Sequence, residues 1–281
     1  MSAAVVCVGL ATLDHIAAVS RQPAPDELVF ATDFAVAGGG PAATAAVTLA
    51  RLGVETAFVG AVGDDDVGAV IRDGLAREGV DVSELRVVPG ARSPQSAIFV
   101  GGGLRTIAAF RGGGLPPLEL SPRARDLCLA AAWVHVDQTG YGAAVPLRGR
   151  IRLSVDGGNP IDGLDLRDVA LYAPTESALR DGFGGPAAAL EAGAELVVVT
   201  RGAEGSVAYG RGGEVVEAPG ETVAVVSTLG AGDVFHGALL ARLVAGAALP
   251  DALTFANRCA ARSCRALDGR SGIPTAAELA S

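Results

Sequence analysis

The stretch Ser227-Thr-Leu-Gly-Ala-Gly-Asp-Val-Phe-His236 lies between a Val-rich run and a longer run of helical length. Gly230, Ala231 and Gly232 carry almost no side chain, so a ligand can approach the backbone closely and meet its amide groups. With the positive end of a helix dipole behind them, such amides form a site for an anion such as a phosphoryl group. Asp233 follows as a first-turn carboxylate, placed to accept a proton from a hydroxyl that attacks phosphorus. Its alternative role is to cap the helix N-terminus.

The rest of the chain alternates between Val- and Ile-rich runs of strand length and Ala-rich segments of helical length. This pattern is typical of α/β folds, in which parallel strands are joined by crossover helices. The predicted strands are residues 5–9, 56–62, 133–136, 151–155, 169–173, 196–200 and 223–226. The predicted helices are residues 42–52, 67–78 and an amphipathic segment at 234–244, each closed by a glycine.

Two segments, residues 17–36 and 96–110, depart from this alternation and look like strands joined by loops or a hairpin. We predict that they pair as a small sheet beside the main one and act as a lid, over about residues 12–36 and 94–112. The junction Gly38-Gly39-Gly40 is placed to serve as its hinge. The alternative is an ordinary strand-to-helix turn, with Pro41 at the start of the helix. No linker or repeat divides the chain, so we expect residues 1–281 to form one domain.

The composition excludes several classes of chemistry. Half of the 281 residues are apolar, which is ample for a buried core. All 22 basic residues are Arg, and without Lys neither a Walker A loop nor a pyridoxal-phosphate or Schiff-base enzyme is possible. The net charge is −9 and no Arg-rich stripe occurs, which argues against nucleic-acid binding. The four cysteines have no zinc-site spacing, so we expect reduced, buried thiols.

The apolar stretches of the sequence are broken by Gly, Arg or Asp before they reach the roughly 18 residues that a membrane span requires. The N-terminus lacks a basic region ahead of its short apolar run at residues 5–10. We therefore expect a soluble cytoplasmic protein whose partner is a small molecule and neither a nucleic acid nor a membrane.

Polar residues follow most of the predicted strands at the point where each strand ends. One such residue would more often be a cap or a turn former. Because ligands of open α/β sheets bind beyond the carboxyl ends of the strands, the repeated placement indicates one ligand-binding rim. In chain order these residues are Asp14, Asp137 and Gln138, Asp156, Thr175 and Glu176, and Thr200 to Gly202.

The stretch 227–236 closely resembles the C-terminal signature of the ribokinase-like (PfkB) carbohydrate kinases, Asp-Thr-x-Gly-Ala-Gly-Asp. The resemblance covers the whole chain and implies a mostly parallel central sheet flanked by helices, with a small β-sheet lid. Further matching motifs are Gly39-Gly40, Arg51-Leu-Gly, Val-Gly-Asp-Asp at 62–65, Thr-x-Gly-x-x-Gly at 200–205 and Gly272-Ile-Pro274. The stretches at 38–46, 93–100 and 232–239 resemble sulfofructose kinases most, with ketohexose and fructose kinases as wider relatives.

Carried over residue by residue, the resemblance implies that Asp233 is the catalytic base and that residues 230–232 stabilise the transferring phosphoryl group. Asp14 would bind sugar hydroxyls, while Gly39 and Gly40 bring the backbone near the sugar. Glu176 would act on the water shell of a Mg²⁺ ion. The ATP molecule would lie along Thr200, Gly202, Gly205 and Thr228, with its adenine near Asn257.

The sequence departs from the family pattern at positions that bear on substrate and ion choice. Ser227 replaces the first signature Asp, which in the family helps to build a monovalent-cation site, so K⁺ dependence is open. Pro41 and Thr44 replace the Lys and Asn that ribokinases carry, which argues against ribose. An anionic sugar would require an Arg. In sulfofructose kinases an Arg follows the mid-chain strand, but Gln138 stands there, so Arg111 at the end of a lid strand is a substitute or simply a solvated edge residue.

We therefore expect an ATP- and Mg²⁺-dependent kinase that phosphorylates a primary hydroxyl of a sugar or ketose, fructose-like or sulfofructose-like. One alternative is an adenosine-like nucleoside kinase on the same fold. Another is a catalytically idle sugar-binding regulator, because Ser227 and Thr175 both depart from the family pattern. A nicotinamide enzyme is disfavoured, because no Gly-x-Gly-x-x-Gly follows the first strand. The resemblance also implies a possible homodimer through the lid, where exposed strand edges would pair.

Four further features have competing interpretations. His236 is expected as a packed or hydrogen-bonded side chain more than as a proton shuttle. For His15 the sequence favours neither of two positions, one lining the pocket beside Asp14 and one away from it. Trp133 is expected in the core, and residues 64–66 are expected to cap the start of a helix.

Overall fold

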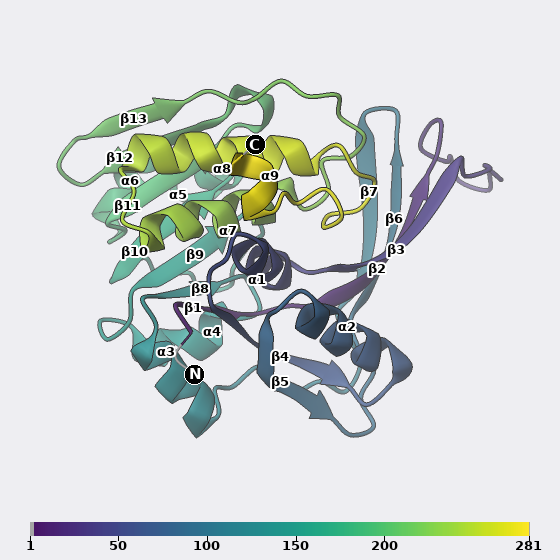
Figure 1. Cartoon of the computed structure of the whole chain (residues 1–281), viewed down its shortest axis with the longest axis horizontal. Coiled ribbons are helices and arrows are strands. Elements are labelled where there is room, and N and C mark those ends of the chain that lie inside the picture. The colour runs from purple at the N-terminus through teal and green to yellow at the C-terminus, as the bar shows by residue number, and fades with distance from the viewer. Residues whose placement is uncertain (1–2, 281) are drawn as a thin grey trace.

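The computed structural model describes residues 3–280 and contains two separate sheets (Figure 1). The larger sheet has nine strands. Seven of them, from β11 to β5 in the sheet order, are parallel, while β12 and β13 form an antiparallel hairpin at one edge. From that edge the order is β13 (Val215–Ala218), β12 (Ser206–Gly210), β11 (Leu196–Thr200), β10 (Val169–Pro174), β9 (Leu153–Gly157), β8 (Trp133–Val136), β1 (Val5–Val8), β4 (Thr56–Gly63) and β5 (Asp81–Val88).

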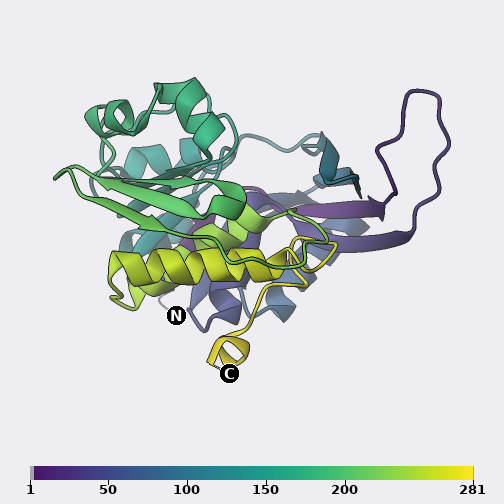
Figure 2. The ribbon, with the colours of Figure 1, turned by 90° about the horizontal axis from the view of Figure 1, so that it is seen from above.

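Helices cover both faces of this sheet and divide the interior into two cores (Figures 1 and 2). Because side chains alternate along a strand, Val5 and Cys7 join one core, while Val6 and Val8 join the other. Burial on both faces explains the near-continuous apolar runs of the parallel strands. The first core lies under α1 (Pro41–Arg51), α2 (Asp66–Arg77), α7 (Ala231–Val244) and α8 (Leu249–Ser263), and the second under α3 (Pro122–Ala130), α4 (Tyr141–Ala144), α5 (Glu176–Phe183) and α6 (Pro186–Glu191). The short α9 (Ala276–Ala280) follows α8.

Helix α7 is not amphipathic, so that part of the prediction was wrong. Residues 234 to 241 are all buried, because α7 packs between α1 and α8 as well as over the sheet. A helix that is apolar on all sides suits such an enclosed position. Its first turn carries Asp233, so the enclosure holds that carboxylate on a rigid element.

The predicted small sheet is present and stands beside the main body (Figure 1). Its strand order is β3 (Asp33–Gly39), β2 (Thr12–Ala18), β6 (Gln95–Gly101) and β7 (Leu104–Phe110). The connection between β2 and β3 extends away from the body as a long loop (Figure 2). Gly102 and Gly103, both at positive φ, turn β6 into β7.

Several local predictions need correction. Residues 223–226 form no strand, and Val225 and Val226 are exposed in the connection to α7, although β-branched residues favour strands. The backbone N–H groups of Val226 and Ser227 instead donate to the Cys264 carbonyl at the end of α8. Strands β5, β12 and β13 were not predicted. The edge strands β5 and β13 carry polar residues and lack a continuous apolar run, and β12, between β11 and β13, is a run of only five residues.

Other local predictions are confirmed. Asp65 caps α2 by accepting the Gly68 N–H at 2.8 Å, as the acidic run at 64–66 indicated. Trp133 is buried in the core, beneath the guanidinium of Arg152 at 4.2 Å from its ring centroid. All four cysteines are free and buried. Among the described residues, no helix has both the length and the apolar character that crossing a bilayer demands.

Asp137, directly after β8, is fully buried and joins three segments of the framework. Its burial raises the carboxyl pKa, while four backbone donors oppose that rise by stabilising the ionised form. The turn after β1, the N-terminus of α1 and the turn after β8 are thereby held together. The donors are the N–H groups of Leu10 (2.8 Å), Ala42 (3.2 Å), Thr139 (2.8 Å) and Gly140 (3.0 Å).

Replacing this carboxylate by an amide tests how far the framework depends on it. In Asp137→Asn an NH₂ group faces backbone donors, so buried N–H groups lose their acceptor and the free energy of unfolding falls by about 2–4 kcal/mol. Urea denaturation measures the loss. The control Asp126→Asn, on the exposed side of α3, changes the value by no more than about 0.5 kcal/mol. Equal midpoints for the two variants would show that the framework does not need the charge at Asp137.

Candidate active site

The polar residues predicted at the strand ends meet along one edge of the large sheet. Asp137, Asp156 and Thr200 lie at the carboxyl ends of β8, β9 and β11, and Glu176 follows β10. Asp14 lies on β2, directly after β1. Because β11, β10, β9, β8 and β1 are consecutive neighbours in the sheet, these residues form one continuous rim.

The turn before α7 presents backbone amides at this rim. Gly230 has φ +72°, a left-handed conformation that glycine adopts without strain, and it precedes the first helical residue. The N–H groups of Gly232 and Asp233, in the first turn, have no carbonyl four residues earlier in the helix to bond, and that of Ala231 makes only a long bond of 3.4 Å to the Thr228 carbonyl. A side chain at Gly232 would project into open space. The turn can therefore accommodate an anion close to the backbone.

Ser227 closes the same loop with its hydroxyl, at the position where the signature has a carboxylate. It is buried, and its Oγ accepts the Leu229 N–H at 3.1 Å. The loop thus has an internal hydrogen bond that does not require an ion.

Asp233 lies half-buried on the first turn of α7, beside these amides. Loss of solvation, followed by the negative charges of Asp156 and Asp137, raises the pKa of Asp233 to about 8, while His236 and Arg105 act in the opposite direction. A carboxylate with a raised pKa binds a proton more readily than an ordinary Asp. This is the property that a general base needs.

His236, three residues after Asp233 on the same helix, is buried and faces Asp156. Its Nδ1 lies 3.2 Å from Asp156 Oδ2. Burial alone would lower the imidazole pKa, but the adjacent Asp156 carboxylate raises it, and in return the pKa of Asp156 is lowered. His236 is thus a buried, paired side chain, as predicted.

His135 on β8 completes a buried group with this pair. One ligand atom from each of His135, Asp156 and His236 lies within 4.8 Å of the others, a spacing that would allow a metal ion. Burial lowers the pKa of His135 to about 3, and its Nδ1 lies 3.1 Å from Ser154 Oγ. The direct contact of opposite charges between Asp156 and His236 accounts for the arrangement without a metal.

Asp14 is buried at the base of the small sheet. Burial raises its pKa, while hydrogen bonds from Thr12 and Ser96 and the charge of Arg270 act against the rise. Thr12 Oγ1 donates to Asp14 Oδ1 at 2.8 Å. A Cβ atom at Gly39 would collide with the Asp14 carboxylate, so a larger residue there would displace that carboxylate.

Arg105, on strand β7 of the small sheet, was not singled out from the sequence. Its Nη1 donates to Thr228 Oγ1 at 2.6 Å, so the small sheet touches the signature loop. Strand register places Arg105 on the same face of the small sheet as Asp14. His15, one residue on from Asp14, points to the opposite face and lies 3.2 Å from Gln95 Oε1, so it does not line the site with Asp14.

Residues 2–144 and 184–276 match the pfkB family of carbohydrate kinases, which is more than half of the chain. The chain belongs to this family. This kinase is therefore a phosphotransferase that acts on an alcohol group of a carbohydrate. It is 28% identical to the ribokinase of Bacillus subtilis over 293 residues, covering 98% of this chain and 97% of that protein. It is 27% identical to the ketohexokinase of Mus musculus over 299 residues, covering 96% and 98%.

Solved structures confirm the fold. The ribokinase of Arabidopsis thaliana complexed with ribose and ATP superposes with a TM-score of 0.85, at 22% identity, covering all of this chain and 98% of the other. A putative ribokinase II from E. coli in complex with ATP and Mg²⁺ gives 0.83, at 23% identity, covering 99% and 98%. The predicted ribokinase-like architecture, with its small additional sheet, is thus confirmed.

The residues expected at the nucleotide lie together on the β10–β11 side of the kinase. Thr200 ends β11 and pairs with Thr175, which caps α5 by accepting the Ala178 N–H at 3.2 Å. This capping role suits Thr where the family has Asn. Glu176 is the exposed first residue of α5. Gly202 and Gly205, both at positive φ, shape the turn after β11.

Three other predicted residues are placed as follows. Asn257 on α8 is buried, and its Nδ2 donates to the carbonyls of Ala218 (2.9 Å) and Pro219 (3.2 Å), so the amide group holds α8 to the end of β13. Gln138 is half-buried directly after Asp137 at the rim. Arg111 directly follows β7 and is exposed.

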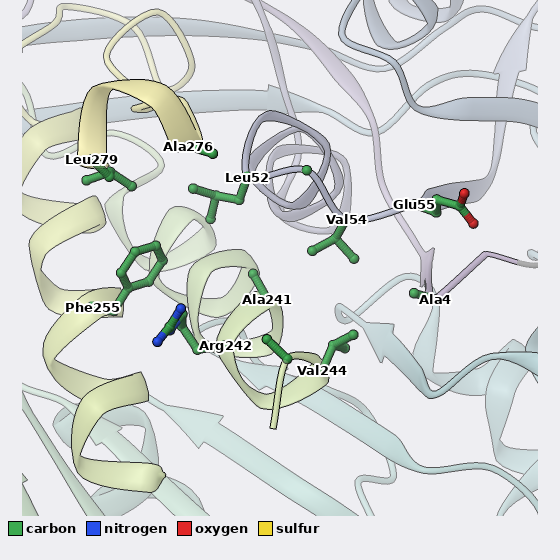
Figure 3. Close-up of a pocket in the computed structure, with 12 residues that line it drawn as sticks. Ala4, Leu52, Val54, Glu55, Ala241, Arg242, Val244, Phe255, Ala276 and Leu279 are labelled. Atoms are coloured by element: carbon green, nitrogen blue, oxygen red, sulfur yellow. The ribbon is translucent and has the colours of Figure 1, made fainter. Parts of the chain in front are cut away.

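A cavity of about 590 Å³ lies elsewhere, at the opposite end of α7 from Asp233 (Figure 3). Ala4 and Glu55, which line it, precede β1 and β4, so the cavity is at the amino ends of the strands. Arg242 lies there over the ring of Phe255, 5.1 Å from its centroid. The remaining lining is mostly apolar, so this cavity lacks the polar groups of the rim.

Proposed function

We propose that this kinase transfers the γ-phosphoryl group of ATP to a primary hydroxyl of a ketose, with Asp233 as the general base. The observation that carries the proposal is the position of Asp233 in the first turn of α7, directly after the glycine-rich turn of residues 230–232 and on the same rim as Asp14. Asp14 and the backbone of Gly39 and Gly40 would hold the sugar. Asp233 would accept the hydroxyl proton as the new O–P bond forms.

The backbone amides would stabilise the charge of the migrating group, since the turn before α7 holds them in place before the reaction begins. The raised pKa of Asp233 also helps to hold the accepted proton on the carboxyl while the phosphoryl group is transferred from ATP. Asp156 and Asp137 produce part of that rise, and the pairing of Asp156 with His236 limits it. The base is thereby kept stronger than a solvated Asp.

ATP and Mg²⁺ occur in the related structures named above, and the residues of this chain fit both. The exposed carboxylate of Glu176 is an oxygen ligand of the kind Mg²⁺ accepts, directly or through water. A bound Mg²⁺ neutralises phosphate charge. Along the nucleotide we place Thr200, Gly202, Gly205 and Thr228, with Asn257 near the adenine. Because Ser227 closes its loop without a carboxylate, we propose that K⁺ is not required.

We further propose that the whole chain forms one kinase domain in which the small sheet is a lid. Arg105 would bring a positive charge from the lid to the phosphate site through its contact with Thr228. Closing the lid excludes water and so limits hydrolysis of ATP. Arg111 stays our candidate for an anionic group on the sugar, and Gln138 for a hydroxyl.

A phosphotransfer screen over ketoses, aldohexoses, sulfofructose, ribose and adenosine tests the function, with and without K⁺. We expect ADP release to depend on a ketose.

Asp233→Asn should lower kcat about 10²- to 10⁴-fold, because the hydroxyl proton loses its acceptor, while calorimetry shows unchanged ATP binding. For the wild type, kcat/KM should rise with pH through about 8 as Asp233 ionises. Transfer to adenosine alone favours a nucleoside kinase, and no transfer at all favours a sugar-binding regulator.

Replacing Arg105 tests the charge delivered by the lid. Arg105→Met should lower kcat about 10- to 100-fold and leave the sugar KM within about threefold, because the guanidinium acts where phosphate charge develops. Arg125→Met, on the exposed side of α3, is the matched control and should behave as wild type. If Arg105→Met changes only the sugar KM, the residue belongs to sugar binding and the proposed role is wrong.

We also propose that the lid mediates a homodimer. Four large apolar side chains of its edge strands are exposed on the face opposite Asp14, namely Phe34, Val36, Leu104 and Phe110. Exposed apolar surface of this kind is costly unless a second surface covers it. Analytical ultracentrifugation should give the mass of two chains, and Phe34→Ser with Val36→Ser should give the mass of one. A single-chain mass for the wild type excludes the dimer.

A further inference from the structure

The loop of residues 268–273, between α8 and α9, is held rigidly although it has no regular secondary structure. Asp268 Oδ1 accepts the N–H groups of Arg270 and Ser271, both at 2.7 Å. Arg51 Nη1 donates to the carbonyls of Arg270 (2.8 Å) and Ile273 (2.9 Å), and the rest of its guanidinium pairs with Glu78. Both side chains and backbone therefore fix the loop.

One end of this loop packs against the phosphate-binding turn. A Cβ atom at Gly230 would lie 3.0 Å from both Cα and O of Gly269, so the two glycine backbones are in close contact. A displacement of the loop at Gly269 would consequently move the turn that begins α7.

The next residue of the loop, Arg270, reaches the sugar side of the site. Its side chain is buried, with 8% of the residue exposed. Nη2 donates to the Gly39 carbonyl at 2.7 Å, and Nε donates to Thr44 Oγ1 at 3.3 Å. A Cβ atom at Gly38 would collide with Nη1. The guanidinium thus supports the junction between β3 and α1.

Arg270 and Asp14 lie on opposite faces of β3. Successive residues of a strand point to opposite faces, and a Cβ at Gly38 would meet Arg270, whereas one at Gly39 would meet Asp14. The backbone at residues 38–39 is therefore in contact with Asp14, the residue expected to bind the sugar, on one side and with Arg270 on the other.

Burying a guanidinium is costly, so its surroundings matter. Burial lowers the pKa of Arg270 to about 10, and the negative charges of Asp14, Glu78 and Asp233 oppose this. The side chain stays charged at neutral pH and lies within the field of both the sugar-binding and the catalytic carboxylate. A neutral side chain would support the backbone without linking these charges.

We propose that Arg270 is a positioning residue that couples sugar binding at Gly39 to nucleotide binding at the Gly230 turn. It does not touch the reacting atoms. One rigid element, residues 269–270, contacts both the sugar side at Gly39 and the nucleotide side at Gly230. A ligand that orders one of these two places therefore lowers the free energy needed to order the other. This inference rests on the proposed function, because it assigns the sugar and the phosphate to these two places.

Titration calorimetry of the full chain measures this coupling. The probe is the ketose found to be the best acceptor, titrated with and without a non-hydrolysable ATP analogue and Mg²⁺. In the wild type, we expect the nucleotide to tighten sugar binding about 10-fold, and by reciprocity the sugar to tighten nucleotide binding equally. In Arg270→Met the factor should fall to about 1, with sugar binding weakened about 10-fold or more and nucleotide binding alone within about twofold.

Matched variants separate coupling from general damage. Arg265→Met, an exposed arginine at the end of α8, should keep the wild-type factor. Arg270→Lys should restore part of it, because the charge returns without the planar fork of donors. Gly38→Ala pushes on the guanidinium from the lid side and should reduce the factor while Arg270 is intact. If Arg270→Met does not fold, the last two variants carry the test.

The outcomes are distinct. A wild-type enzyme that binds or phosphorylates no ketose refutes the proposed function. An active wild type whose coupling factor is 1, or is unchanged in Arg270→Met and Gly38→Ala, overturns the role of Arg270 and leaves the proposed function standing.

Discussion

The buried carboxylate of Asp137 is the constraint on which the rest of the site depends. It lies after β8, whose neighbour in the centre of the sheet is β1, so the turns after both strands meet at one point. That convergence tolerates no side chains on the facing backbone. A Cβ atom at Gly9 would collide with the Asp137 carboxylate, and one at Gly140 would collide with the Val8 carbonyl. With α1 also held by Asp137, the start of β2 and the lid junction have fixed positions.

Three carboxylates at this rim have different surroundings, and the differences assign their roles. Asp137 accepts four backbone N–H groups and is structural. Asp156 faces the imidazole of His236, which lowers its pKa. Asp233 has no comparable partner of its own, and loss of solvation, followed by the charges of the other two, raises its pKa to about 8. Environments that separate the pKa values of neighbouring carboxyl groups allow one fold to hold a structural anion beside a base of the kind that we propose at Asp233.

The sequence predicted the centre of the fold better than its edges, for a physical reason. Strands β8 and β11 were predicted to the residue, because strands buried on both faces consist mostly of apolar residues. The Val-rich run at 223–226 has the same composition but lies exposed on the surface, which composition alone does not reveal. Glycine-rich motifs and rim carboxylates were recognisable locally. Arg105 and Arg270 were missed, because their partners Thr228 and Gly39 lie 123 and 231 positions away in the chain.

Because the chain has no Lys, positive charge at the phosphate has to come from backbone amides and from Arg. The amides of residues 230–232 are fixed parts of the main body and, in the proposed function, would meet the phosphate as soon as the nucleotide binds. Arg105, by contrast, is carried by β7 of the small sheet and reaches the signature loop only where that sheet contacts it. If the small sheet closes over the sugar as proposed, the last positive charge arrives together with the exclusion of water. ATP bound in the open site then lacks that charge. Because water cannot hold the lid closed, water reacts with ATP more slowly than the sugar hydroxyl does.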